Sequence, residues 1–345
     1  MVDGVDLRDL SDGTEGSSLV SHRRGYRGGM TGRVLSFAPP ASRDGSYLAL
    51  ELLPGRVQGA LIDPGGRFRA RRERRFDPAA SRREILAEVD RVATGLARTS
   101  SLGGCVVSAG GVLDTAGGRM VQVVDMPSLE GCAIVEHLRA LVDAPTLLEH
   151  RARLQVQGDH YFGAGQGEET FASVATGDTL GVGILYQGRI LAPDGGRSGA
   201  HMTVAGGERD CSCGKQGCWR TIATTAWLRE RAGALDLPAQ DLADWERCAA
   251  EDPRAAVVVA EYARNIAVGL ANIQQLCMPG LFILHGEAAQ ASEGFRERIL
   301  ETLQDLSRTG SETEPRLVTT ALVEDDSTLL GGVALLLHRG LPSIG

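Results

Sequence analysis

The segment CSCGKQGC, residues 211–218, places three cysteines within eight positions. Zinc prefers four tetrahedral ligands from cysteine and histidine, and Cys211, Cys213 and Cys218 supply three of them. Glycines inside the segment allow tight backbone turns that would bring the sulfurs together, and His201, ten residues upstream, is a candidate fourth ligand. Four such ligands leave no open position, so the zinc would be structural. Spacing alone leaves open the alternative of three free thiols that merely lie close.

The chain has seven cysteines, and the four outside this cluster are scattered and typical of small buried hydrophobic residues. The first 18 residues are acidic and polar with no hydrophobic stretch, which indicates no signal peptide. We find no apolar run near the length that crosses a bilayer. We therefore expect a cytoplasmic protein, and in that reducing compartment a tight cysteine cluster favours a metal site over disulfides.

Length and composition predict a globular protein with two lobes. The chain has 345 residues, of which 43% are hydrophobic and 23% charged. A net charge of −8 argues against whole-surface binding to nucleic acid or to an anionic membrane. Two arginine-rich runs, 22–27 and 67–75, are interpreted as solvated loops or a strand edge protected by charge, with phosphate contact as the alternative.

Hydrophobic periodicity predicts an α/β fold with mixed sheets flanked by helices. Residues 1–46 show little periodicity and are expected to be poorly ordered. The predicted strands are 47–53, 57–63, 104–112, the first part of 146–162, a hairpin of 169–176 and 181–191, and 281–289. The predicted helices are 81–97 with Ser81 as N-cap, 133–143, the second part of 146–162, 225–235, 254–280 and 327–340.

The combination HMTV…CSCGKQGC resembles the signature of the ROK family of bacterial sugar repressors and sugar kinases, and the resemblance extends over about 47–342. It implies an actin-like ATPase fold, ribonuclease H-like, with a sugar cleft between two lobes. It also implies that His201, Cys211, Cys213 and Cys218 bind structural zinc. We accordingly expect a first lobe of 47–148 plus 327–342, and a second lobe of 149–326 that carries the zinc loop.

The nucleotide-binding segments of the family's kinases are altered in this chain. The phosphate loop Asp-x-Gly-Gly-Thr corresponds to ELLPGR (51–56), where a proline removes an amide and two leucines add bulk. The run Gly-Thr-Gly-Ile-Gly corresponds to GDTLG (177–181), and the late Gly-Gly-Gly to HGE (285–287). Together the three changes predict that the chain does not bind ATP.

The catalytic base of the kinases is also replaced. Their Glu-Asn-Asp-Ala-Asn corresponds to EHRAR (149–153), so Arg151 stands where an aspartate would accept the sugar hydroxyl's proton. An arginine cannot serve as that base at neutral pH. Asp159 lies eight residues further on, and we interpret it as a solvated helical acid and not a substitute base.

The positions that bind the sugar in the family carry chemically different residues in this chain. Ser198 and Arg220 stand where the family has glutamates that accept hydrogen bonds from sugar hydroxyls. The resulting candidate ligand-binding residues are Glu149, His150, Arg151, Ser198, His201 and Arg220. Two guanidinium groups in a partly buried cleft need a partner. A bound anion, such as an acidic or phosphorylated sugar, is one prediction, and internal pairing with Glu149 or Glu287 is the other.

The leading hypothesis for function is a non-catalytic, ligand-sensing ROK protein related to sugar-responsive transcription regulators. An enzyme that reuses the cleft for other chemistry, through His150, Arg151, His201 or Arg220, is the alternative. A purely structural or partner-binding role is a third hypothesis, and an active sugar kinase is disfavoured. The run at 29–41 resembles the end of a winged helix, but no preceding helices are visible, so DNA binding is doubtful. By family habit we expect a homodimer.

Overall fold

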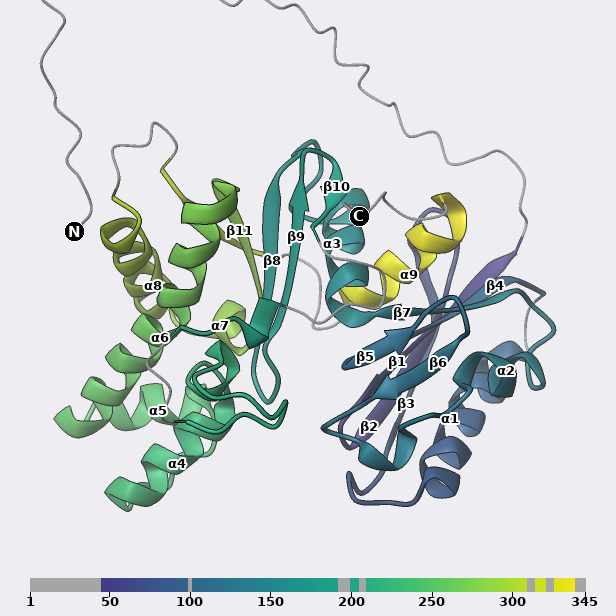
Figure 1. Ribbon diagram of the computed structural model, residues 1–345, viewed down its shortest axis with the longest axis horizontal. Helices are drawn as coiled ribbons and strands as arrows, with labels where there is room; N and C mark the ends of the chain where they lie inside the picture. Colours follow the sequence, from purple (N-terminus) through teal and green to yellow (C-terminus); the bar gives the residue numbers. More distant parts are fainter. Residues whose placement is uncertain are drawn as a thin grey trace, which may run out of the picture. The chain divides into compact units, whose positions relative to one another are not determined.

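The computed structural model describes residues 45–98, 101–191, 199–204, 209–308, 314–320 and 326–338. The wing-like run at 29–41 and Ser198 lie outside the described residues. Two five-stranded sheets organise the described part of the chain, which confirms the predicted α/β class (Figure 1). The boundaries of the two lobes and the homodimer stay predictions.

The first sheet has the strand order β3-β2-β1-β4-β7. Its strands are β1 (Ser46–Leu53), β2 (Arg56–Ile62), β3 (Phe68–Arg75), β4 (Leu102–Ala109) and β7 (Thr146–His150). The first three form an antiparallel meander, while β4 and β7 continue the sheet in parallel with β1. Parallel strands end at the same edge, so the carboxyl ends of β1, β4 and β7 deliver their loops to one place.

Helix α1 (Arg82–Ala97) packs on this sheet. The Ser81 hydroxyl accepts from the backbone N–H of Glu84, and the Glu84 carboxylate accepts from the backbone N–H of Ser81. This capping box confirms the predicted helix start. The smaller elements that follow β4 are β5 (Val112–Asp114), β6 (Arg119–Gln122), the 3-10 helix η1 (Pro127–Leu129) and α2 (Ile134–Arg139).

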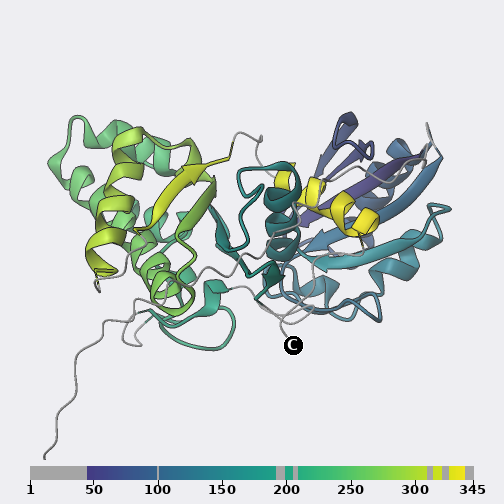
Figure 2. The same ribbon diagram turned by 90° about the horizontal axis from the view of Figure 1, so that it is seen from above.

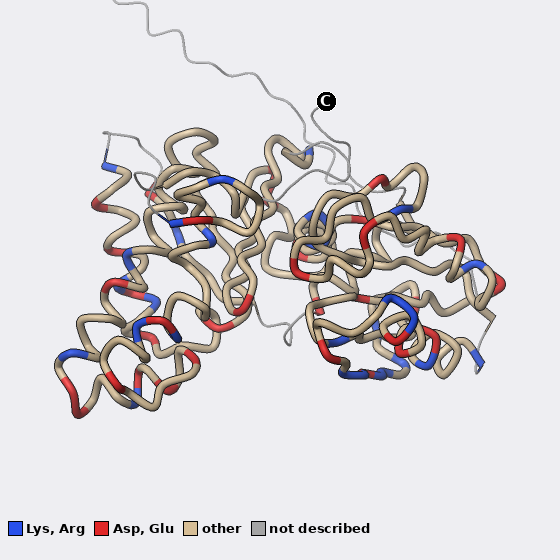
Figure 3. Tube along the Cα trace, turned by 60° about the horizontal axis from the view of Figure 1, so that its bottom comes forward, with Lys and Arg blue, Asp and Glu red and all other residues tan. Residues whose placement is uncertain are grey.

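Strand β3 carries the second arginine-rich run at the edge of the first sheet. All of its residues after Phe68 are exposed, so the run is the charged strand edge that the sequence allowed. Arg69 pairs with Asp63, and Arg71 pairs with Asp326. Acidic and basic residues alternate along much of the described chain (Figure 3).

The second sheet has the order β10-β9-β8-β11-β12. The predicted hairpin is β8 (Phe171–Thr176) with β9 (Gly181–Tyr186), and β11 (Leu281–Gly286) runs parallel to β8. The edge strands are β10 (Arg189–Ile190) and β12 (Arg316–Thr319). The remaining elements of this part are η2 (Gly199–His201), η3 (Trp219–Thr221), α4 (Thr225–Leu235), α5 (Leu242–Ala249), α6 (Pro253–Cys277), α7 (Glu287–Gln290) and α8 (Glu293–Leu306).

Helix α6 is the longest helix that the structure describes. It has the length and hydropathy of a membrane span, and 56% of its most apolar window is buried inside the protein. Its buried side chains include Tyr262, Ile266 and Leu270, which pack in the same core as Trp219. The helix is therefore a core element by its contacts and gives only weak support for a membrane span.

Helices α3 (Arg151–Phe162) and α9 (Asp326–His338) lie side by side in both ribbon views (Figures 1 and 2). Two glycines make the close approach. A Cβ at Gly158 would stand 1.8 Å from the carbonyl oxygen of Ser327, and a Cβ at Gly331 would stand 1.8 Å from that of Leu154. Both approaches are too short for any side chain, so the crossing requires glycine at both positions.

Candidate functional site

A pocket that opens to solvent collects the loops at the ends of strands from both sheets. Ligand sites of α/β proteins are found at such strand ends. The elements around the first sheet contribute 52–54, 110–112, 122–126 and 150–152. The elements around the second sheet contribute 179–181, 200–201, 213 and 220. Four predicted ligand residues, His150, Arg151, His201 and Arg220, thus line one pocket.

The four predicted metal ligands lie together beside this pocket. One ligand atom each from His201, Cys211, Cys213 and Cys218 falls within 4.8 Å of all the others. The Sγ atoms of Cys213 and Cys218 are 3.7 Å apart, and Cys211 Sγ is 3.6 Å from His201 Nδ1. A tetrahedral ion with metal–sulfur distances of about 2.3 Å spaces its sulfurs by about 3.7 Å. The donor set and its spacing therefore fit a tetrahedral metal ion.

Local backbone geometry explains why the loop closes around this cluster. Gly214 and Gly217 have φ angles of 84° and 69°, which only glycine adopts without strain. The backbone N–H of Cys211 donates to the carbonyl of Lys215 at 2.8 Å, and the Lys215 ammonium donates to the carbonyl of His201 at 3.2 Å. These bonds hold the ligand-bearing segments together, as the sequence predicted from the glycines.

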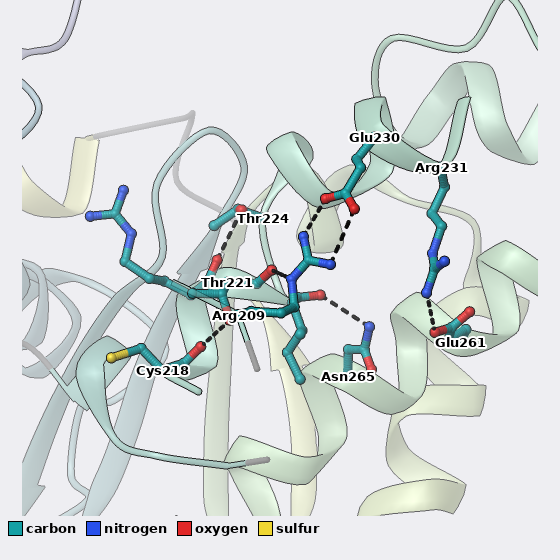
Figure 4. Close-up of polar contacts among 10 residues, drawn as sticks. Arg209, Cys218, Thr221, Thr224, Glu230, Arg231, Glu261 and Asn265 are labelled. Atoms are coloured by element: carbon teal, nitrogen blue, oxygen red, sulfur yellow. Dashed lines mark hydrogen bonds and ion pairs between the residues drawn. The ribbon is translucent and has the colours of Figure 1, made fainter. Parts of the chain in front are cut away.

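Hydrogen bonds hold the segment that follows the cluster, and Figure 4 shows the one between Thr221 and Cys218 in close-up. The Thr221 hydroxyl donates to the carbonyl of Cys218 at 2.7 Å, and the Thr224 hydroxyl donates to the carbonyl of Arg220 at 3.0 Å. The indole of the fully buried Trp219 donates to the carbonyl of Asn265 on α6 at 2.8 Å. The backbone of Arg220 is thereby fixed on both sides, while its side chain lines the pocket.

The side chain of Arg220 pairs with Asp125, which lies in the loop between β6 and η1. Its Nη atoms reach both carboxylate oxygens at 3.3 Å. Such charge-assisted bonds are typically about 2.7–2.9 Å long. The Arg220 side chain is 18% exposed and that of Asp125 is 36% exposed. The pair is therefore long, partly solvated and weak.

The side chain of Arg151, at the start of α3, makes a tighter pair. Its Nε donates to Oε1 of Glu51 at 2.7 Å, and Oε2 of Glu51 accepts from Gln58 at 2.6 Å. Glu51 is completely buried, while the Arg151 side chain is 15% exposed. The guanidinium lies beside Gly181, where a Cβ would stand 3.4 Å from its Nη1, in ordinary van der Waals contact.

Internal pairing of the two arginines is thus present, with Glu51 and Asp125 as partners that the sequence analysis did not name. Glu149 is buried and accepts from the backbone N–H of His150, and it also pairs with Arg153 at 3.1 Å. Glu287 accepts instead from the Thr225 hydroxyl at 2.9 Å. Glu149 also does not line the pocket, so its predicted contact with a ligand finds no support. Sequence spacing could not reveal Glu51 and Asp125 as partners, because each lies far from its arginine in the chain.

His150 lines the pocket as a neutral ring. Burial, followed by the charges of Arg153 and Arg151, lowers the pKa of His150 to about 4. Its Nδ1 accepts from the backbone N–H of Ala152 at 3.2 Å, so the proton resides on Nε2. The ring therefore offers a hydrogen-bond donor and no charge at neutral pH.

The three altered nucleotide segments lie in described parts of the chain. ELLPGR forms a tight β1–β2 hairpin in which Leu52 pairs with Val57 and Leu53 with Arg56. The GDTLG turn places Asp178 against Arg229 at 2.9 Å. In HGE, Glu287 opens α7, and burial raises the pKa of its carboxyl group.

The interpretation of Asp159 as a solvated acid was wrong. Asp159 is completely buried, and its Oδ2 accepts from the Ser173 hydroxyl at 2.5 Å and from His285 Nε2 at 2.8 Å. Its Oδ1 accepts from the Ser327 hydroxyl at 3.0 Å. The carboxylate therefore joins α3, β8, β11 and α9 through hydrogen bonds. The adjacent Gly158, a sign of close packing on that face of α3, could have indicated this.

Comparison with known proteins places these features in a family. The model of the ROK family matches residues 48–339. A glucokinase of Halalkalibacterium halodurans is 26% identical over 210 residues, which cover 54% of this chain and 62% of that protein. The DNA-binding transcriptional dual regulator NagC of Escherichia coli is 26% identical over 247 residues, 68% of this chain and 60% of that protein. The alignments thus span about three fifths of these curated relatives.

Solved ROK structures share the fold. The ROK hexokinase from Thermus thermophilus matches with a TM-score of 0.70 and 25% identity, covering 84% of this chain and 97% of that one. A ROK glucokinase from Streptomyces griseus, in complex with glucose and AMPPNP, matches with a TM-score of 0.74 and 21% identity, covering 86% of this chain and 100% of that one. A ROK transcriptional regulator, homolog of the Escherichia coli MLC protein, matches with a TM-score of 0.71 and 19% identity, covering 85% of this chain and 77% of that one. These actin-like, ribonuclease H-like neighbours include kinases and regulators alike.

Proposed function

The chain belongs to the ROK family, and we propose that it is a ligand-sensing member that binds a sugar-derived molecule in its pocket without phosphorylating it. The observation that carries this proposal is the buried pair of Arg151 and Glu51. At the place where the resemblance puts the kinases' base stands a cation, and the nearest carboxylate holds it by a 2.7 Å bond. General-base assistance is typically worth about 10²–10⁴ in rate.

The one acid of the pocket lining does not stand where the resemblance puts the kinases' base. Among the described residues that line the pocket, Asp125 is the one acid, and it is paired with Arg220. His150 has its pKa lowered to about 4 and carries its proton on the nitrogen that is free to donate. The pocket therefore presents donors and fixed charges that suit binding, while proton abstraction from a hydroxyl has no evident acceptor.

The metal cluster supports the same proposal as a structural part of the pocket wall. We propose that zinc is held by His201, Cys211, Cys213 and Cys218, whose thiolate and imidazole donors suit it. Two of these residues, His201 and Cys213, also line the pocket. The metal would fix the loop that presents Arg220 and would leave no open coordination position for catalysis.

The test is a pair of measurements on the purified full chain. We expect no sugar-dependent release of ADP from ATP over a panel of hexoses, hexosamines and uronic acids. We also expect at least one compound of the panel to raise the melting temperature, since a ligand at 100 times its Kd stabilises by about 2.7 kcal/mol. Sugar-dependent turnover of about 1 s⁻¹, the low end of ordinary enzymes, would contradict the proposal.

A variant and its control show whether the ligand-induced rise in melting temperature comes from binding in the pocket. Arg151→Gln should abolish the ligand-induced rise in melting temperature, because it leaves the buried Glu51 without its ion-pair partner beside the pocket. Arg316→Gln removes an exposed arginine that pairs with Glu168 away from the pocket, and it should leave the rise unchanged. Equal responses of both variants would mean that the ligand binds elsewhere.

A further inference from the structure

One wall of the pocket is apolar, which a site for a bare sugar does not require. Leu52 and Leu53 end β1, and Pro54 makes the turn to β2. Val124 and Met126 approach from the loop after β6, and Leu180 approaches from the turn before β9. Small-molecule sites with such walls bury hydrophobic parts of their ligands, and a few polar groups fix the orientation.

A cation stands within the same pocket. The backbone of Arg220 is fixed by the bonds from Thr224 and around Trp219, so its guanidinium is presented at low cost in conformational entropy. Among the described residues, its side chain contacts one carboxylate, that of Asp125, at 3.3 Å. The corresponding bond of Arg151 to Glu51 is 2.7 Å long, and that carboxylate is completely buried.

The two pairs therefore differ in how easily a ligand displaces them. Replacing Glu51 would require a buried carboxylate to lose its partners, whereas Asp125 is 36% exposed and can turn to solvent. A ligand carboxylate that approaches Arg220 at normal hydrogen-bond distance, in bidentate geometry, would improve on the 3.3 Å contacts. Arg220 is thus the cation of the pocket whose present partner, Asp125, a ligand can replace.

We propose that the pocket selects a sugar acid that carries an apolar substituent, with the acid on Arg220 and the substituent against the wall of Leu52, Leu53, Val124, Met126 and Leu180. The sugar part of this inference rests on the proposed function, while the acid and the apolar substituent rest on the pocket itself. Asp125 is the internal competitor that the ligand's acid displaces.

The experiment uses four probes that vary the two features independently. They are methyl β-D-glucoside, phenyl β-D-glucoside, methyl β-D-glucuronide and phenyl β-D-glucuronide, and calorimetry measures each Kd with the full chain. We expect phenyl β-D-glucuronide to bind most tightly. The phenyl group and the carboxylate should each improve affinity by about tenfold or more, as expected for filling an apolar pocket and for a charged pair with arginine.

Three variants assign these gains to residues. Arg220→Gln should remove the preference for glucuronides and keep the preference for phenyl over methyl. Val124→Ser should do the reverse. Asp125→Asn should tighten both glucuronides, because it removes the competing carboxylate. A gain in affinity cannot arise from a failure to fold, so this variant tests the inference even if the other two are destabilised.

Two matched controls lie away from the pocket. Arg316→Gln and Val257→Ser alter an exposed arginine and an exposed valine, and both should leave all four Kd values unchanged. Equal affinity for methyl β-D-glucoside and phenyl β-D-glucuronide would overturn the inference and leave the proposed function intact. Unchanged glucuronide affinity in Arg220→Gln and Asp125→Asn would also overturn it. Phosphorylation of a sugar would instead contradict the proposed function.

Discussion

At the scale of single residues, the stability of the buried carboxylate of Asp159 depends on the hydrogen bonds that its neighbours donate. It accepts from two serine hydroxyls and from His285, and none of its surface is exposed. A buried charge is stable only when hydrogen bonds replace its lost hydration. Removing the acceptor therefore leaves several donors unsatisfied at once.

We predict that Asp159→Asn lowers the free energy of unfolding by about 2–4 kcal/mol, because one acceptor oxygen becomes an NH₂ group that faces other donors. Urea unfolding measures the change. The control Asp305→Asn alters an aspartate that is 69% exposed and pairs with Arg308, so it should change stability by less than about 0.5 kcal/mol. Equal effects of the two variants would count against the buried network.

Single residues also show how far sequence reasoning reached. The candidate metal ligands were found because their donors share a known spacing, and Arg151 and Arg220 were found because they replace residues of opposite charge. Their partners Glu51 and Asp125 were missed. Nothing in the local sequence of a carboxylate tells which distant guanidinium it meets, since that depends on how the two sheets deliver their loops.

At the scale of elements, caps and periodicity predicted most helices well. Helix α4 occupies the predicted residues, and α1 begins after the predicted N-cap. Helix α8 was not predicted, although Phe295, Ile299 and Leu303 repeat every four residues and lie buried along it. Strand β3 was left open between a loop and a strand, because its exposed arginines on both faces hide the usual alternation.

The crossing of α3 and α9 provides a test of how closely two elements must approach. We predict that Gly331→Ala destabilises the protein by at least about 2 kcal/mol, because its Cβ would overlap the carbonyl of Leu154 and push the helices apart. Gly233→Ala on α4 is the matched control, since a Cβ there meets nothing within 4 Å. It should stabilise by about 0.5–1 kcal/mol through helix propensity. Thermal unfolding measures both variants. A shift of both melting temperatures in the same direction would contradict the prediction.

At the scale of the whole molecule, the pocket and the metal cluster form one unit assembled from distant parts of the chain. His201 and Cys213 belong to both, and Cys218 directly precedes the helix that carries Arg220. The family resemblance predicted that these features would occur together. It could not predict that Arg220 would pair with Asp125 at the pocket, because Asp125 lies outside the motifs that carry the resemblance.

Because the pocket and the cluster share residues, loss of the metal should affect the pocket wall that the cluster forms, while the ladder of β1 and β2 remains intact. We predict one zinc per chain, and we predict that a strong chelator increases amide hydrogen exchange over residues 209–221, because metal binding and loop folding are coupled. Peptides from β1 and β2 should keep their protection, since their ladder does not touch the cluster. Cys213→Ser should reproduce the effect of the chelator, and Cys277→Ser, at the end of α6 outside the cluster, should not.

Elemental analysis that finds less than a third of an equivalent of zinc, or exchange that is unchanged by the chelator, would contradict a structural metal. If instead the metal is bound but exchange rises equally in Cys277→Ser, the loop owes its order to packing around Trp219, which is buried in the core against α6.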